Sequence, residues 1–183
     1  RVIMDLAEGE IKQNLNRFDS GQTFSKYINK SYCKTASLIA NSTKASGVLS
    51  NLEDEKLDSL YEFGKNIGLA FQVVDDILDF TGNDKQLGKP AVSDLASGYL
   101  TAPVLYALEE NKNLSVLINR ELVEKEDLNN ALNIVMDSQA IKRSRKLAED
   151  FAFRSNEAIS WLPESDYKRA LLSLPEFVLS RLY

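Results

Sequence analysis

Apolar side chains recur every three to four residues along most of the chain, which is the spacing of amphipathic helices. Ile3, Leu6, Ile11 and Leu15 follow it at the start. The pattern predicts helices over residues 1–18, 24–49, 52–80, 101–111, 124–137, 139–161 and 164–182. No segment shows a convincing two-residue alternation of a strand. The sequence therefore predicts an all-α bundle of long helices, forming a single domain over residues 1–183.

Residues 81–100 interrupt this pattern, because they contain Gly82, Gly88, Pro90 and Gly98. These residues predict a long loop. Loops of this length inside a compact domain are usually functional. We therefore expect a functional role for the loop that follows the helix over 52–80.

A row of polar side chains lies near the end of that helix. Because each helical residue turns by about 100°, Gln72, Asp75, Asp76 and Asp79 share an arc of roughly 100°. A solvated acidic face is the common explanation of such a row. Residues 66–80 contain no Lys or Arg, however, so the usual salt bridges of an exposed helix are absent. Carboxylates that face into a helical bundle favour a metal site, and oxygen ligands favour Mg²⁺.

Two lysines could bind the phosphates that often accompany Mg²⁺. Lys34 lies mid-helix among small and apolar residues, where a cation usually pairs with an anion; a lysine that reaches solvent along its stem is the alternative. Lys89 lies in the predicted loop, where lysines are common. Asp94 could cap the next helix or reach the carboxylates, and capping is the more common role.

Composition narrows the chemistry. The 183 residues include no His and one Cys, which excludes imidazole catalysis, histidine-bound zinc and an internal disulfide. With 27 acidic and 22 basic residues the net charge is −5, which argues against a general nucleic-acid binder. No apolar run reaches the ~18–20 residues of a membrane span. Carboxylates, lysines, hydroxyls and Mg²⁺ remain as the candidate chemical groups.

Several motifs together resemble the trans-isoprenyl (polyprenyl) diphosphate synthases. Phe71-Gln-Val-Val-Asp-Asp-Ile-Leu-Asp-Phe80, followed by Gly88-Lys-Pro-Ala91, resembles the second aspartate-rich region of that family. Tyr32-Cys-Lys-Thr-Ala-Ser-Leu38 resembles its Lys-Thr motif. The likeness covers nearly the whole chain and is greatest to plant solanesyl-type synthases. It implies the C-terminal half of an isoprenoid-synthase helical bundle, with the N-terminal helices missing.

The resemblance also implies a reaction. An allylic diphosphate and isopentenyl diphosphate would condense to a longer polyprenyl diphosphate, with Mg²⁺ bound together with the substrate diphosphate. Carried over from the family, Asp75 would be the principal metal ligand. Asp76 and Asp79 would bind the metal directly or through water.

Further roles follow from the same resemblance. Lys34 and Lys89 would hold the allylic diphosphate, while Thr35 and Gln72 would line the site near the developing cation. The family pattern implies a homodimer or heterodimer formed through helices. Likeness to plant solanesyl-type synthases implies a plastid or mitochondrion, with the cytoplasm as the alternative.

The likeness has gaps. The family's first Asp-Asp-x-x-Asp motif is absent, and Arg1 in place of Met is what a processed protein or a fragment would show. Val92 stands where relatives usually have Gly. We expect little or no synthase activity from this chain alone. A non-catalytic partner subunit of a heteromeric synthase is the alternative function, which the intact second motif argues against; a helical scaffold without a ligand is a third.

Overall fold

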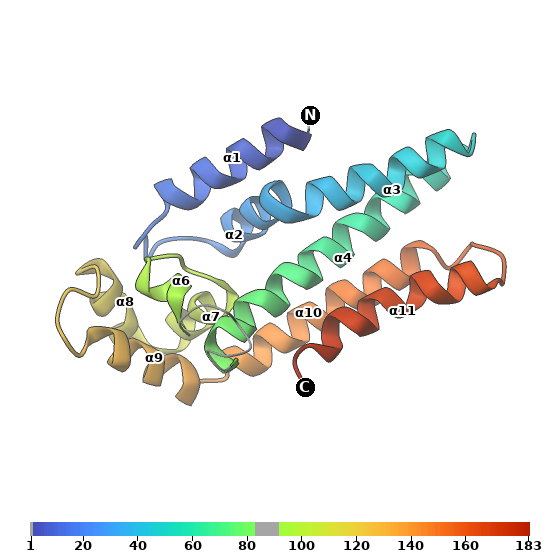
Figure 1. Cartoon of the computed structure of the whole chain (residues 1–183). Helices are drawn as coiled ribbons and strands as arrows, with labels where there is room; N and C mark the ends of the chain where they lie inside the picture. Colours follow the sequence, from blue (N-terminus) through green and yellow to red (C-terminus); the bar gives the residue numbers. More distant parts are fainter. Residues whose placement is uncertain (1, 83–91) are drawn as a thin grey trace.

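The computed structural model describes residues 2–82 and 92–183, and every regular element within those ranges is a helix (Figure 1). The predicted all-α class is therefore confirmed. The helices are α1 (Val2–Leu15), α2 (Phe24–Ser31), the π-helical segment η1 (Tyr32–Ala36), α3 (Ser37–Leu49), α4 (Asp54–Thr81), α6 (Ser93–Ala96), α7 (Ala102–Glu110), α8 (Lys112–Asn119), α9 (Asp127–Asp137), α10 (Ala140–Ala158) and α11 (Asp166–Ser180).

The 28-residue helix α4 is the centre of the bundle. It packs against α3 on one side and against α10 and α11 on the other, as Figure 1 shows. Its apolar side is fully buried at Ala70, Val73, Val74 and Ile77. Burial of such side chains stabilises a bundle by about 1.5–3 kcal/mol for each large one. The polar row at its end is thus held on the most constrained element of the fold.

Two glycines let α4 approach the preceding helix closely. A Cβ placed on Gly68 would lie 2.6 Å from the Cα of Ala36, and one on Gly64 would lie 2.7 Å from the carbonyl oxygen of Ile39. No side chain fits at such distances without displacing the neighbouring backbone. The contact between Gly68 and Ala36 fixes the end of η1 against α4.

The predicted helix over 24–49 is one continuous helical path, but its middle is π-helical. Residues Tyr32–Ala36 form η1 between α2 and α3. Such π segments are rare, insert an extra residue into a turn and occur often at functional sites. η1 contains both Lys34 and Thr35, the two residues that the sequence places in the Lys-Thr motif.

Other differences concern the connections. The range 112–119, which the apolar pattern leaves unassigned, forms α8, capped by Asn111. The predicted loop over 81–100 contains the short helix α6. Among the residues described here, no helix combines the length and the apolar character that crossing a bilayer requires.

Candidate functional site

The polar row lies along the last turns of α4, between α2 on one side and the end of α11 on the other (Figure 1). Gln72, Asp75, Asp76 and Asp79 all lie within this helix, as predicted. The structure gives each carboxylate a different environment. The row therefore has a buried edge and an open edge.

Asp76 forms the buried edge. Its carboxylate is 1% exposed and accepts two hydrogen bonds, from the hydroxyl of Tyr27 at 2.6 Å and from Nε2 of Gln72 at 2.8 Å. Burial raises the pKa of the Asp76 carboxyl to about 6, although the charge of Lys30 and the two hydrogen bonds lower it. Burial in turn lowers the pKa of the Lys30 ammonium, which the charge of Asp76 partly offsets.

Gln72 extends the network to η1. Its Oε1 accepts a hydrogen bond of 2.8 Å from the hydroxyl of Thr35. A continuous chain of hydrogen bonds therefore runs from Thr35 through Gln72 and Asp76 to Tyr27. It joins η1, α4 and α2, and it brings together three of the predicted site residues.

Asp75 forms the open edge. Its side chain is 39% exposed, and Oδ1 lies 2.7 Å from Nη2 of Arg181, which follows α11. The guanidinium of Arg181 lies over the ring of Phe71, 4.7 Å from the centroid. Both ionic groups are about one third or more exposed, so solvent screens the pair strongly. Asp75 is thus the accessible carboxylate of the row.

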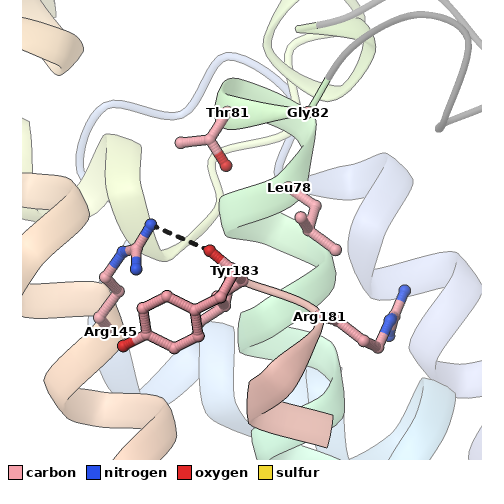
Figure 2. Close-up of a pocket in the computed structure, with 7 residues that line it drawn as sticks. Leu78, Thr81, Gly82, Arg145, Arg181 and Tyr183 are labelled. Carbon is pink, nitrogen blue, oxygen red and sulfur yellow. Dashed lines mark hydrogen bonds between the residues drawn. The ribbon is translucent and has the colours of Figure 1, made fainter.

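A cavity of about 480 Å³ adjoins this edge, and Figure 2 shows its lining residues. Arg145, on α10, donates a hydrogen bond of 3.4 Å to the carbonyl of Leu182. Its guanidinium and that of Arg181 lie on opposite sides of the chain end in Figure 2. Both arginines line this cavity.

Asp79 is 1% exposed, and its side chain accepts hydrogen bonds from the first residues of α6. Its Oδ1 accepts from the hydroxyl of Ser93 at 3.0 Å, and its Oδ2 accepts from the backbone N–H of Asp94 at 3.1 Å. Val92, just before, donates its N–H to the carbonyl of Asp79 at 2.7 Å and adopts a left-handed φ of 60°. Direct metal binding by Asp79 would require these donors to move.

Lys34 faces α1 in this structure. Its Nζ donates to Oε1 of Gln13 at 3.0 Å and lies 3.1 Å from Oε1 of Glu10. A Cβ on Gly9 would lie 2.8 Å from the backbone nitrogen of Lys34, so α1 packs tightly on η1 at this point. Lys89 lies outside the described residues.

The oxygen atoms of the row would need further ligands from outside the protein to complete a Mg²⁺ site. Across residues 2–82 and 92–183, no three carboxylate, cysteine or histidine side chains gather closely enough to hold a metal ion. Within the row, Asp75 is the one carboxylate that solvent reaches, and the other side chains of the row also offer oxygen atoms. Mg²⁺ typically binds through one or two carboxylates, waters and substrate phosphates. Such a set fits Mg²⁺ whose remaining ligands are water and phosphate oxygens.

Three residues of this site escaped the sequence analysis as functional groups: Tyr27, Lys30 and Arg181. Tyr27 precedes the Lys-Thr motif on the same helical path, but that motif lies in the π-helical segment η1, so helical spacing alone does not place Tyr27 beside Asp76. Nothing local in the sequence connects Arg181 with Asp75.

Fold and site together define an all-α protein whose central helix carries one partly exposed and two buried carboxylates, with Asp76 joined through Gln72 to the hydroxyl of Thr35. A sequence model described as "Polyprenyl synthetase" matches residues 1–135. The chain is 52% identical over 182 residues to a "Prenyl transferase" of Synechocystis sp., covering 100% of this chain and 56% of the relative. It is 45% identical to "Solanesyl diphosphate synthase 2, chloroplastic" of Arabidopsis thaliana, covering 100% of this chain and 44% of the relative.

Solved structures agree. Heptaprenyl diphosphate synthase from Staphylococcus aureus superposes with a TM-score of 0.92 at 33% identity, over 98% of this chain and 57% of that one. This chain belongs to the polyprenyl synthetase family. It spans about half the length of the relatives that it matches. The predicted family, its isoprenoid-synthase bundle and the correspondence to part of the family's length are confirmed.

Proposed function

We propose that this chain provides the C-terminal half of the active site of a trans-polyprenyl diphosphate synthase. The reaction joins an allylic diphosphate to isopentenyl diphosphate. The allylic C–O bond breaks and its electron pair leaves with the diphosphate; the double bond of isopentenyl diphosphate forms the new C–C bond, and a proton is then lost. The observation that carries this proposal is the accessible Asp75 beside the Thr35–Gln72 pair, in a chain of this family.

Each residue then has a task. Asp75 would hold Mg²⁺ directly. Asp76 and Asp79, the other predicted ligands of the row, would keep their buried hydrogen-bond donors and reach the metal through water. Bound Mg²⁺ would stabilise the charge of the departing diphosphate. Lys34 and Lys89 would bind the allylic diphosphate, and Thr35 and Gln72 would lie near the developing cation.

Two of these tasks require an exchange of partners. Asp75 must release Arg181, and Lys34 must release Glu10 and Gln13. Both ion pairs are partly exposed, and such pairs typically stabilise by only about 0–1 kcal/mol. A metal-bound diphosphate can therefore displace them at small cost.

The proposal extends to the oligomeric state of the chain and to its cellular compartment. Helix α1 exposes several apolar side chains, which supports association of this chain through its helices, as a homodimer or a heterodimer; these side chains are Ile3, Met4, Leu6, Ile11 and Leu15. The names of the Arabidopsis relatives include "chloroplastic", which supports a plastid location over a mitochondrial or cytoplasmic one.

A prenyl-transfer assay with labelled isopentenyl diphosphate and Mg²⁺ tests the proposal. We expect little or no product from this chain alone. Product should form when the chain is fused behind the part of the Synechocystis relative that lies outside the match. Asp75→Asn should then lower activity by about 10²-fold or more, because an electrostatic group at the reacting phosphate is lost.

Three outcomes would contradict it. Robust product from the chain alone would show that no second half is needed. A folded fusion without product would reject the synthase activity. Unchanged activity in Asp75→Ala, when the chain is co-expressed with a partner, would indicate a non-catalytic subunit.

A further inference from the structure

Tyr27 is a fully buried residue to which the family motifs assign no task. Its side chain is 0% exposed, and its ring packs edge-on against Phe24 with 6.0 Å between the centroids. The hydroxyl donates to Asp76 at 2.6 Å. The Nζ of Lys30 lies 5.1 Å from the centre of its ring. Tyr27 therefore lies between the core of the bundle and the polar row.

The hydrogen bonds of this row have a fixed direction. An ionised carboxylate can only accept, so Asp76 must receive both the O–H of Tyr27 and the N–H₂ of Gln72. Gln72 consequently turns its oxygen the other way, towards Thr35. The Thr35 hydroxyl then has to donate, as its 2.8 Å contact with Oε1 of Gln72 shows.

This direction matters for a cation. With its hydrogen committed to Gln72, the Thr35 oxygen has its remaining lone pairs to offer to the site. A hydroxyl turned the other way would present a partial positive charge instead. Groups whose dipoles are fixed before the reaction act more strongly than mobile ones, because no reorganisation is needed.

We propose that Tyr27 is a positioning residue, which holds Asp76 as the anchor of the row and so makes Thr35 present an oxygen lone pair to the developing allylic cation. This inference rests on the proposed function for its last step, but its first step concerns the network alone. Asp76 is then the fixed point of the network rather than a group that exchanges onto the metal.

Tyr27→Phe removes the donor and keeps the ring. One oxygen of Asp76 is then left without its donor in a buried place, where an unsatisfied charged group is costly. The carboxylate has to turn towards other donors, such as the second N–H of Gln72 or Lys30. Gln72 would follow, and its oxygen would lose its alignment with Thr35.

The first experiment measures hydrogen exchange of the Gln72 carboxamide in the full chain, labelled with ¹⁵N-glutamine. Gln72→Met identifies the signal by its loss. We expect slow exchange in the parent chain and exchange about tenfold faster or more in Tyr27→Phe. The matched control is Tyr106→Phe, since Tyr106 also packs against Phe24 but has no hydrogen bond from its hydroxyl within the described residues. Equal exchange in Tyr27→Phe and the parent chain would overturn the proposal.

The second experiment uses the fused enzyme described above and measures the single-turnover rate of prenyl transfer. Tyr27→Phe should lower this rate by about tenfold, less than the 10²–10³-fold typical of a direct contact, because it acts through Asp76 and Gln72. The Mg²⁺ concentration for half-maximal rate and the KM for isopentenyl diphosphate should stay within about twofold. Tyr106→Phe should match the parent enzyme in all three.

The metal requirement separates a positioning role from a ligand role. If Tyr27→Phe and Asp75→Asn both raise the Mg²⁺ requirement strongly, Asp76 serves the metal, and the proposal is wrong. An unchanged single-turnover rate in Tyr27→Phe would also reject it. A folded fusion that makes no product would refute the proposed function instead, and the exchange measurement would then decide alone whether Tyr27 orders the row.

Discussion

Asp75 and Asp76 are adjacent on α4 but face opposite edges of the polar row. Asp76 is 1% exposed and accepts from Tyr27 and Gln72, two neutral donors in fixed positions. Asp75 is 39% exposed and pairs with Arg181, a long side chain near the end of the chain. Burial raises the pKa of the Asp76 carboxyl to about 6.

The difference separates two tasks that one motif combines. A carboxylate that must take up and release a metal with each ligand needs a partner that leaves easily. A cation in an exposed ion pair is such a partner, because solvent screens the pair. A carboxylate that sets the direction of neighbouring groups needs partners that stay. Asp75 has the first kind of environment and Asp76 has the second.

The largest expected difference between the two edges is in stability. Asp76→Ala leaves the hydroxyl of Tyr27 and the amide of Gln72 without an acceptor, and each buried unsatisfied group costs about 1–3 kcal/mol. We expect a loss of about 2–4 kcal/mol in the free energy of unfolding, measured by urea denaturation. Asp75→Ala, the matched control, should lose less than about 1 kcal/mol, because it breaks only a screened surface pair.

This comparison can fail in two ways. Equal losses in the two variants would mean that Asp76 is not a structural anchor. A loss in Asp75→Ala as large as about 3 kcal/mol would mean that its pair with Arg181 is far stronger than its exposure indicates.

The sequence was sufficient for the long helices and for the position of the row, because periodicity reports which residues share a helical face. It missed the short helices α6 and α8. The family resemblance ranked Asp75 first among the metal ligands, but the sequence could not give the different environments of Asp75 and Asp76. Tyr27, on α2, and Arg181, which follows α11, give them their environments, and only tertiary packing brings these two residues to α4. The π segment around Lys34 was also beyond reach, since its residues have no pattern distinct from an α-helix.

A second, smaller effect should appear on the open edge. Arg181→Gln removes the cation that occupies Asp75 and leaves the buried edge untouched. If Asp75 binds Mg²⁺ with diphosphate, the affinity for Mg²⁺-diphosphate should rise by up to about fivefold, the equivalent of the ~1 kcal/mol of a surface pair. Isothermal titration with Mg²⁺ and inorganic diphosphate measures this directly, and Arg154→Gln, at an exposed position of α10, is the control. Weaker binding in Arg181→Gln would instead make Arg181 a ligand of the diphosphate.

The smallest effect concerns Asp79, whose contacts with Ser93 and Asp94 depend on the turn at Val92. Val92 has φ 60° and ψ 25°, a left-handed conformation that costs L-residues about 1–2 kcal/mol but costs glycine little. Its side chain is also 6% exposed, so removing it loses buried apolar contact worth about 1.5 kcal/mol or more. For Val92→Gly these two terms nearly cancel, and we expect a change of about 1 kcal/mol or less in the free energy of unfolding.

Val92→Ala makes this expectation sharp. Alanine loses most of the buried contact and keeps the left-handed strain, so it should be less stable than Val92→Gly by about 0.5–1 kcal/mol. At an ordinary helical site the order is reversed, with glycine the less stable by a similar amount. Urea denaturation of the two variants side by side measures the order. If Val92→Ala proves the more stable variant, the left-handed conformation does not constrain this position. The hydrogen bonds of Asp79 to Ser93 and Asp94 then do not depend on that conformation.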